Sequence, residues 1–291
     1  MFNVSCESTC DLPFEYLKER NCEVLFYTYT VDGVDFDDDM GRNPAALPSL
    51  YDAIKTKRPT TSQINVTAYE EFFLKLLQKG DLLHVTFSSG LSQSASNAFK
   101  AAENVAKMNL PHKLYVVDSL CGGGGYGLFV DGLLDERDKG ATFETLCNRA
   151  TERRLCVHHF FFSTDLTYFR RSGRVSGAAM LIGNLLKICP VMRVKEDGKI
   201  AAYTKTISSK KAVAKLAEEM KANATEGENY NGKLWIQHSN CWATAYQTKE
   251  TLEKIFPNVS EIKIFDVGTV MACHCGPDTV AIYFWGKKRC Y

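Results

Sequence analysis

The sequence predicts a two-domain α/β protein. Its 291 residues exceed the usual size of one hydrophobic core. Up to about residue 153, β-rich apolar runs alternate with helical patterns, which is typical of a mostly parallel sheet flanked by helices. Beyond that point a hairpin and several strands mix with helices. We therefore expect an N-terminal α/β domain over residues 1–153 and a C-terminal mixed α/β domain over 154–291, with a ligand between them.

Composition restricts the function. Thirty-five basic and 34 acidic residues give a net charge of +1, so nothing favours nucleic acid or an anionic membrane surface as partner. The N-terminus lacks signal-peptide features, and no apolar run reaches the roughly 18–20 residues that span a bilayer. We expect a cytoplasmic protein. The eleven cysteines include no C-x-x-C pair, which favours reduced, buried thiols over disulfides or a metal site.

The first strands are predicted from β-rich runs and turn residues. Residues 24–31 form one such run, and Asp32-Gly33 after it indicates a hairpin turn. The acidic residues between Asp35 and Asp39 are expected in a solvated loop, because they lack the glycine and glutamate of an EF-hand. Thr67 and Glu70 fit a capping box at the start of a helix, which leaves Thr60-Thr61-Ser62 on a loop.

A serine-rich junction at residues 88–94 is the first candidate site. It follows the apolar run from Leu82 to Phe87 and precedes a helical pattern from Ala95. Such a junction lies at the carboxyl edge of a sheet, where ligands bind, and a helix start attracts a small anion. The serines could equally serve only as helix caps. The hydroxyl donors available there belong to Ser88, Ser89, Ser92 and Ser94.

A glycine run, Gly122 to Gly127, follows the next predicted strand and precedes a helix expected from about Leu128. It matches no phosphate-binding loop, because no Gly-Lys-Ser/Thr follows. It fits a dinucleotide fingerprint only because glycine fills nearly every position. A nucleotide site stays an alternative, and close approach of the backbone to a ligand or a neighbouring helix would also explain the glycines.

The second half supplies further strands and one notable histidine. Cys156 to Phe162 has too few polar residues for an exposed strand, and an apolar stretch runs from Ala178 to Ile188. Asp197-Gly198 indicates a hairpin turn between two predicted strands. His274 lies in Cys273-His274-Cys275-Gly276-Pro277, which we expect to be a turn. Near a bound anion its imidazolium would favour the ligand. The other expected strands are 233–237, 261–265 and 279–285, with a helix near 246–255.

Several motifs occur in a fixed order along nearly the whole chain. They are Glu7-Ser8-Thr9-Cys10-Asp11-Leu12-Pro13, Thr61-Ser62-Gln63, Ser89-Gly90-Leu91-Ser92-Gln93-Ser94, Asp118-Ser119, Leu166 to Ser176, Lys187-Ile188-Cys189-Pro190 with Asp197-Gly198-Lys199, and His274-Cys275-Gly276-Pro277. Each motif is weak alone. In this order they resemble the DegV family of bacterial fatty-acid-binding proteins.

The resemblance implies a carrier without catalytic residues, metal or cofactor, holding one long-chain fatty acid between its domains. Thr61 and Ser92 would bind the carboxylate, with Ser62 and Ser94 beside them and His274 approaching from the C-terminal domain. The tail would lie in an apolar tunnel largely in the second domain. In better understood members a separate fatty acid kinase phosphorylates the bound acid for phospholipid synthesis. We expect neutral donors at the carboxylate, because a bidentate arginine would occupy both oxygens and hinder phosphorylation.

Departures from the family pattern keep alternatives open. Glu7 replaces an aspartate, and Ile207 stands where many members have an arginine on a surface thought to meet the kinase, which weakens the case for that partner. A different class of function is a hydrolase of acyl esters or acyl phosphates with Ser92 as nucleophile, although no base for it can be identified. The third hypothesis is an enzyme that binds a nucleotide through the glycines of residues 122–127.

Overall fold

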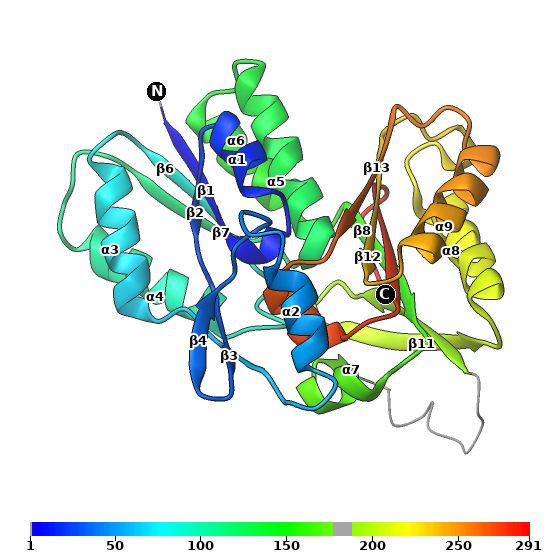
Figure 1. The fold of residues 1–291 in the computed structure, drawn as a ribbon. Coiled ribbons are helices and arrows are strands. Elements are labelled where there is room, and N and C mark those ends of the chain that lie inside the picture. Colours follow the sequence, from blue (N-terminus) through cyan, green and yellow to red (C-terminus); the bar gives the residue numbers. More distant parts are fainter. Residues whose placement is uncertain (1, 177–187) are drawn as a thin grey trace.

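The computed structural model describes residues 2–176 and 188–291, so most of the predicted apolar stretch from Ala178 to Ile188 lies outside the described residues. Two main sheets stand side by side in Figure 1, with α5 (Gly123–Asp138) between them. The predicted two-domain α/β architecture is confirmed. The boundary after residue 153 falls between α6 (Phe143–Arg153) and β8 (Val157–Ser163), and as a division into independent units it stays a prediction.

The N-terminal sheet is parallel, as predicted. Its strand order is β2 (Cys22–Leu25), β1 (Asn3–Glu7), β6 (Leu82–Thr86) and β7 (Leu114–Asp118). Residues 82–86 are buried throughout, as a strand covered on both faces should be. The helices of this half are α1 (Phe14–Glu19), α2 (Ala46–Ala53), α3 (Val66–Leu77), α4 (Ser94–Ala106), α5 and α6.

A small antiparallel sheet corrects two predictions. The run 24–31 is not one strand, because the chain leaves the main sheet at residues 26–27, where the Tyr27 N–H donates to Ser8 Oγ at 3.0 Å. It continues as β3 (Thr28–Val31), which pairs through the predicted hairpin with β4 (Val34–Asp37). Thr60-Thr61-Ser62 is not a loop but β5 (Thr60–Ser62), an edge strand on β3. This pairing satisfies backbone groups and fixes which way Thr61 points.

Two local expectations nearby are also wrong. The N-cap of α3 is Asn65, whose Oδ1 accepts from the Ala68 N–H at 2.9 Å, so the Thr67–Glu70 capping box does not form. Asp38 is fully buried rather than solvated, and the Thr269 hydroxyl donates to it at 2.8 Å. Burial raises the pKa of Asp38.

The C-terminal sheet is mixed, as predicted, with β8 near its centre. Phe160 and Phe162 belong to a core with α8 (Ser209–Asn223) and α9 (Trp242–Ile255), whereas Phe161 faces the opposite side. Alternation along one strand thus supplies a core on each face. The strand order is β13 (Glu261–Asp266), β12 (Lys233–Ser239), β14 (Thr279–Trp285), β8, β10 (Cys189–Val194), β11 (Ile200–Thr206) and β9 (Val175–Ser176).

Short helices complete the chain. They are η1 (Ser8–Cys10), η3 (Gly227–Asn229), α7 (Thr167–Ser172) and α10 (Thr269–Cys275). The expected turn at residues 273–277 is instead the end of α10 and the residues after it. α10 contacts α2, β3, β5 and α7, so it meets elements of both halves of the chain.

The glycine run belongs to α5 itself, which begins at Gly123 and not near Leu128. These glycines face the second sheet. A Cβ at Gly125 would overlap the His159 ring, and one at Gly124 would come within 2.7 Å of Phe265 and Tyr283. The run therefore lets a helix of the first half pack closely on the sheet of the second.

Gly125→Ala should destabilise the protein. Helix propensity alone would favour alanine by about 0.5–1 kcal/mol. Overpacking against the buried His159 ring typically costs about 1–3 kcal/mol, and we expect that effect to dominate. Chemical denaturation should show a lower free energy of unfolding, whereas Ser96→Ala, on an exposed position of α4, should change it little. A Gly125→Ala protein as stable as the wild type would contradict the packing role.

Candidate functional site

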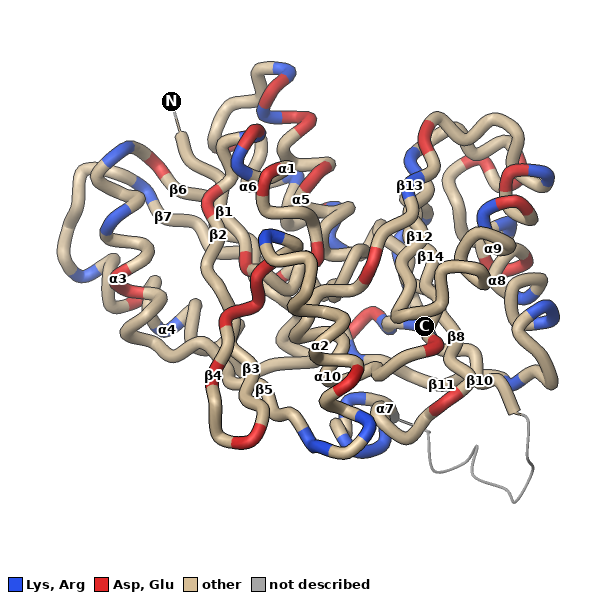
Figure 2. The backbone as a smooth tube through the Cα atoms, viewed as in Figure 1, with Lys and Arg blue, Asp and Glu red and all other residues tan. Residues whose placement is uncertain are grey.

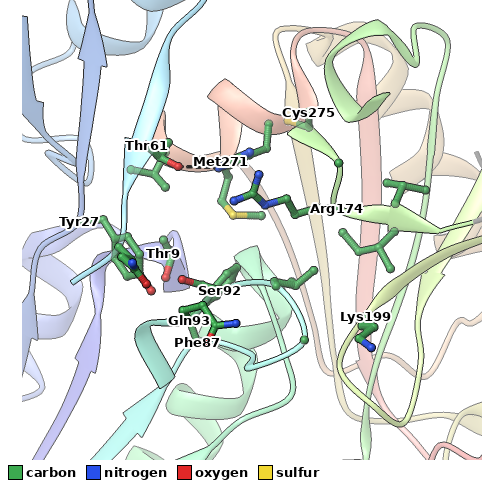
Figure 3. Close-up of a pocket in the computed structure, with 18 of the residues that line it drawn as sticks. Thr9, Tyr27, Thr61, Phe87, Ser92, Gln93, Arg174, Lys199, Met271 and Cys275 are labelled. Carbon is green, nitrogen blue, oxygen red and sulfur yellow. Dashed lines mark hydrogen bonds between the residues drawn. The ribbon is translucent and has the colours of Figure 1, made fainter. Parts of the chain in front are cut away.

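A cavity of about 690 Å³ lies between the two halves of the chain (Figure 3). Its wall from the N-terminal half carries mainly hydroxyl and amide groups, and the opposite wall combines apolar side chains with arginine and lysine. The residues that carry the argument below are Thr9, Tyr27, Thr61, Ser62, Ser92, Phe169, Arg174, Ile200, Met271 and His274.

Thr61 and His274 meet in this cavity although 213 residues separate them. Strand β5 directs Thr61 inward, and the last turn of α10 brings the His274 ring to it, with 2.9 Å between Thr61 Oγ1 and His274 Nε2. Burial, aided by the positive charge of Arg174, lowers the pKa of His274 to about 4. The ring is therefore neutral at neutral pH in the absence of ligand, and an imidazolium beside a bound anion stays a prediction. A neutral ring that donates from Nε2 would leave the Thr61 proton free for a ligand.

The serines of the junction play different parts. Ser92 lines the cavity, and its Oγ accepts from the Ser94 N–H at 3.2 Å at the start of α4. Ser94 is fully buried behind it, where its Oγ accepts from the Ile64 N–H at 3.0 Å. Ser62 lines the cavity but is largely exposed. As ligand-binding residues all three stay predictions, and the geometry favours Ser92 over Ser94 for direct contact.

A buried carboxylate underlies the serines. Glu7 Oε2 accepts from the Phe87 N–H at 2.8 Å and lies 3.4 Å from Tyr27 Oη, while Glu7 Oε1 accepts from Tyr69. The Tyr27 oxygen is in turn within hydrogen-bonding reach of Ser92 and Ser94. Burial raises the pKa of Tyr27 well above its usual value, so the phenol stays neutral. A polar network thus runs from the protein interior to the cavity surface.

Sequence reasoning missed several lining residues. Arg174 points into the cavity in Figure 3 and was not among the expected site residues, while the expectation that neutral groups donate to the carboxylate stays a prediction. Both Arg174 and Thr9 lie inside motifs of the family pattern, so a signal existed for them. Tyr27 and Met271 carry no such signal. Figure 2 shows that lysines and arginines gather around α7, at the edge of the cavity, whereas acidic residues follow β4.

The cavity has an apolar extension toward the second sheet. A smaller space of about 50 Å³ shares Leu91, Phe169, Ile200, Met271 and Cys275 with the main cavity. Its further walls come mostly from the C-terminal sheet, including Phe161, Val194, Ala281 and Tyr283. One ligand could thus place a polar end on the hydroxyls and an apolar end against the sheet.

A second cavity, of about 680 Å³, has the opposite electrostatic character. Asp11, Asp39, Asp52 and Asp266 line it, and Lys55 is the basic residue among the described residues that form its wall. Burial raises the pKa of Asp11, but the carboxylates of Asp39, Asp52 and Asp266 repel an anionic ligand. The serine- and threonine-lined cavity is therefore the better site for an anion.

The alternatives drawn from the sequence gain no structural support. Of the described residues that line the main cavity, His274 is the histidine; it is hydrogen-bonded to Thr61, and no hydrogen bond in the described part of the chain joins it to Ser92 as a general base would require. Gly124 and Gly125 pack against side chains of the second sheet, which fill the place that phosphates would need. Among the described residues, no three His, Cys, Asp or Glu side chains are arranged to hold a metal ion. None of the described helices is long and apolar enough to cross a membrane.

The fold and the site define a class of protein: a two-domain α/β protein with a mixed polar and apolar cavity between its halves. A family model described as "Uncharacterised protein, DegV family" matches residues 1–287, and the chain belongs to the DegV family.

Individual relatives match over nearly their full length. A protein of Thermotoga maritima named "Fatty acid-binding protein" is 29% identical over 281 residues, 94% of each chain. The crystal structure of a DegV lipid-binding protein from Thermotoga maritima is 25% identical, covers all of both chains and has a TM-score of 0.84. The Streptococcus pneumoniae fatty acid kinase B3 protein, loaded with linoleic acid, is 20% identical, with 99% and 100% coverage and a TM-score of 0.82.

The titration of His274 tests the electrostatics of the cavity. Because its pKa of about 4 lies below the value of about 6.5 for an unfolded histidine, its contribution to stability is present above pH 6.5 and is lost as the pH falls toward 4. NMR of the unliganded protein should show a neutral His274 ring at pH 6. Arg174→Gln should raise the pKa only in part, since burial is the larger cause, and Arg171→Gln should leave it unchanged. A wild-type ring that titrates near 6.5 would contradict this account.

Proposed function

We propose that this protein binds one long-chain fatty acid, with its carboxylate on the hydroxyls of Thr61 and Ser92 and its tail running along the apolar wall of the main cavity toward the extension at the second sheet. The observation that carries the proposal is the continuity of a hydroxyl-lined cavity with an apolar one, which matches a ligand with one polar end. Relatives at 29% and 25% identity are named as fatty-acid-binding and lipid-binding proteins.

The energetics divide the work between the two ends of the ligand. Each buried methylene contributes ~0.8 kcal/mol, so a dozen contribute roughly 10 kcal/mol before ordering costs. A hydrogen bond to a charged group contributes about 1.5–3 kcal/mol. The tail should therefore dominate affinity, while Thr61, Ser92 and the neutral His274 orient the carboxylate. Arg174 adds a positive charge near the carboxylate without a hydrogen-bonded carboxylate partner among the described residues.

We further propose that the protein has no catalytic activity of its own and presents the bound acid to a fatty acid kinase in the cytoplasm. The open, basic edge around α7 would suit the approach of a phosphate donor (Figure 2). Ile207, immediately after β11, is 69% exposed and offers a partner no charge. We therefore expect the interaction with a kinase to be weak at this position.

Native mass spectrometry tests ligand binding directly. Protein purified from a bacterial host should carry a mass increment equal to one fatty acid. Thr61→Ala and Ser92→Ala should each weaken binding about tenfold, because each removes a donor to a charged oxygen. Thr60→Ala is a matched control, since Thr60 lies next to Thr61 in β5 but faces the other side of the strand.

Two results would contradict the proposed carrier function. An empty protein that hydrolyses a chromogenic acyl ester, with activity lost in Ser92→Ala, would establish the hydrolase instead. Unchanged lipid retention in both Thr61→Ala and Ser92→Ala would show that the carboxylate is bound elsewhere.

Replacing Ile207 tests the kinase proposal. With a bacterial fatty acid kinase catalytic subunit and ATP, the wild type should yield acyl phosphate slowly, and Ile207→Arg should lower the apparent KM several-fold in a salt-sensitive manner. Ile207→Ala separates the loss of an apolar side chain from the gain of charge. Equal rates for Ile207→Arg and Ile207→Ala would exclude a charge-dependent contact here.

A further inference from the structure

Thr9 is an unusual side chain in the wall of the cavity. It lies in η1, is only 1% exposed, and its hydroxyl has no hydrogen-bond partner among the described residues. It nevertheless lines the cavity, and Figure 3 shows it beside Tyr27 and Ser92. A buried hydroxyl without a partner is unfavourable, so such a group in a ligand cavity requires an explanation.

The polar groups around Thr9 already have partners. Ser8 Oγ accepts from the Tyr27 N–H at 3.0 Å. The Tyr27 proton is directed inward, because Glu7 Oε2 also accepts from the Phe87 backbone N–H, which can only donate and so fixes that oxygen as an acceptor. Tyr27 therefore cannot turn its proton outward without leaving Glu7, and no neighbouring group compensates Thr9.

The fold holds Thr9 rigidly in this position. η1 packs on α5, where a Cβ at Gly127 would come within 2.5 Å of the Cys10 carbonyl oxygen. The backbone on either side of Thr9 is also fixed, since Asp11 N–H donates to the Ser8 carbonyl at 3.0 Å. These contacts fix the position of Thr9 in the wall of the cavity.

We propose that Thr9 is a further ligand-binding residue, whose hydroxyl donates a hydrogen bond to the carboxylate of the bound acid. This inference rests on the proposed function. Thr9 and Ser92 then approach the carboxylate from the N-terminal half near Tyr27, while Thr61 and His274 approach from β5 and α10. The rival explanation is that only the Thr9 methyl group matters and its hydroxyl is idle.

Thr9→Val distinguishes the two explanations because valine keeps the shape and removes only the hydroxyl. Without ligand, the variant should be at least as stable as the wild type, since an unpartnered hydroxyl is lost. With [1-13C]palmitate, its dissociation constant should rise about tenfold. The carboxyl 13C signal of the bound acid should titrate at higher pH, because one donor to the ionised form is missing.

Two further variants act as controls. Thr9→Ser keeps the hydroxyl and should retain the wild-type carboxyl titration. Thr279→Val removes another buried hydroxyl without a partner among the described residues, on the wall of the apolar extension. It should stabilise the unliganded protein in the same way but tighten binding, and the carboxyl titration should not move.

The outcomes separate failure of the proposed function from failure of the role of Thr9. A wild-type protein that does not bind [1-13C]palmitate would overturn the proposed function and this inference with it. A wild type that binds, with an unchanged dissociation constant and carboxyl titration in Thr9→Val, would overturn the role of Thr9 alone. If Thr9→Val fails to fold, loss of the wild-type carboxyl titration in Thr9→Ser would overturn the proposal as well.

Discussion

The close packing of α5 on the C-terminal sheet is the contact on which the site depends. Gly124, Gly125 and Gly132 remove the side chains that would otherwise hold the helix away from Tyr283, His159 and Trp285. The N-terminal half carries Thr61 and Ser92, whereas α10 and β11 belong to the other half. Because the cavity is formed by both halves, the distance between them sets its width. A helix that stood further from the sheet would separate Thr61 from His274.

Helices, strands and turns could be predicted from the sequence where a local pattern of residues determines the structure. The fully apolar run of β8, the turn at Asp197-Gly198 and the alternation of strands and helices in the first half all reflect burial or turn geometry that neighbouring residues specify. The predictions failed where contacts with distant parts of the chain determine the local structure. The run 24–31 divides because Ser8, from another element, accepts the Tyr27 N–H. Asp38 is buried because Thr269, more than two hundred residues later, provides a hydrogen bond to it.

The candidate site shows the same division. Thr61, Ser92 and His274 line one cavity, and their hydroxyl and imidazole groups could be selected from ordered motifs. Their ionisation and hydrogen-bond directions could not. The low pKa of His274 comes from burial and from Arg174, and neither is visible in sequence spacing. The role of Tyr27 could not be predicted either. It depends on Glu7, at the end of β1, and on Phe87, which follows β6 and donates its N–H to Glu7.

The arrangement reconciles firm binding of a carboxylate with access to it. A single buried arginine with bidentate geometry would stabilise the anion strongly but cover both oxygens. Here Thr61 and Ser92 can each donate one hydrogen bond from a different direction, and the neutral His274 ring, by donating to Thr61 Oγ1, leaves the Thr61 proton free for the ligand. Arg174 contributes charge from an exposed position. Such donors leave lone pairs of the carboxylate uncovered, and the desolvated tail supplies most of the affinity. Neutral donors bind the carboxylate less strongly than a bidentate arginine would, and burial of the apolar tail offsets that loss of affinity.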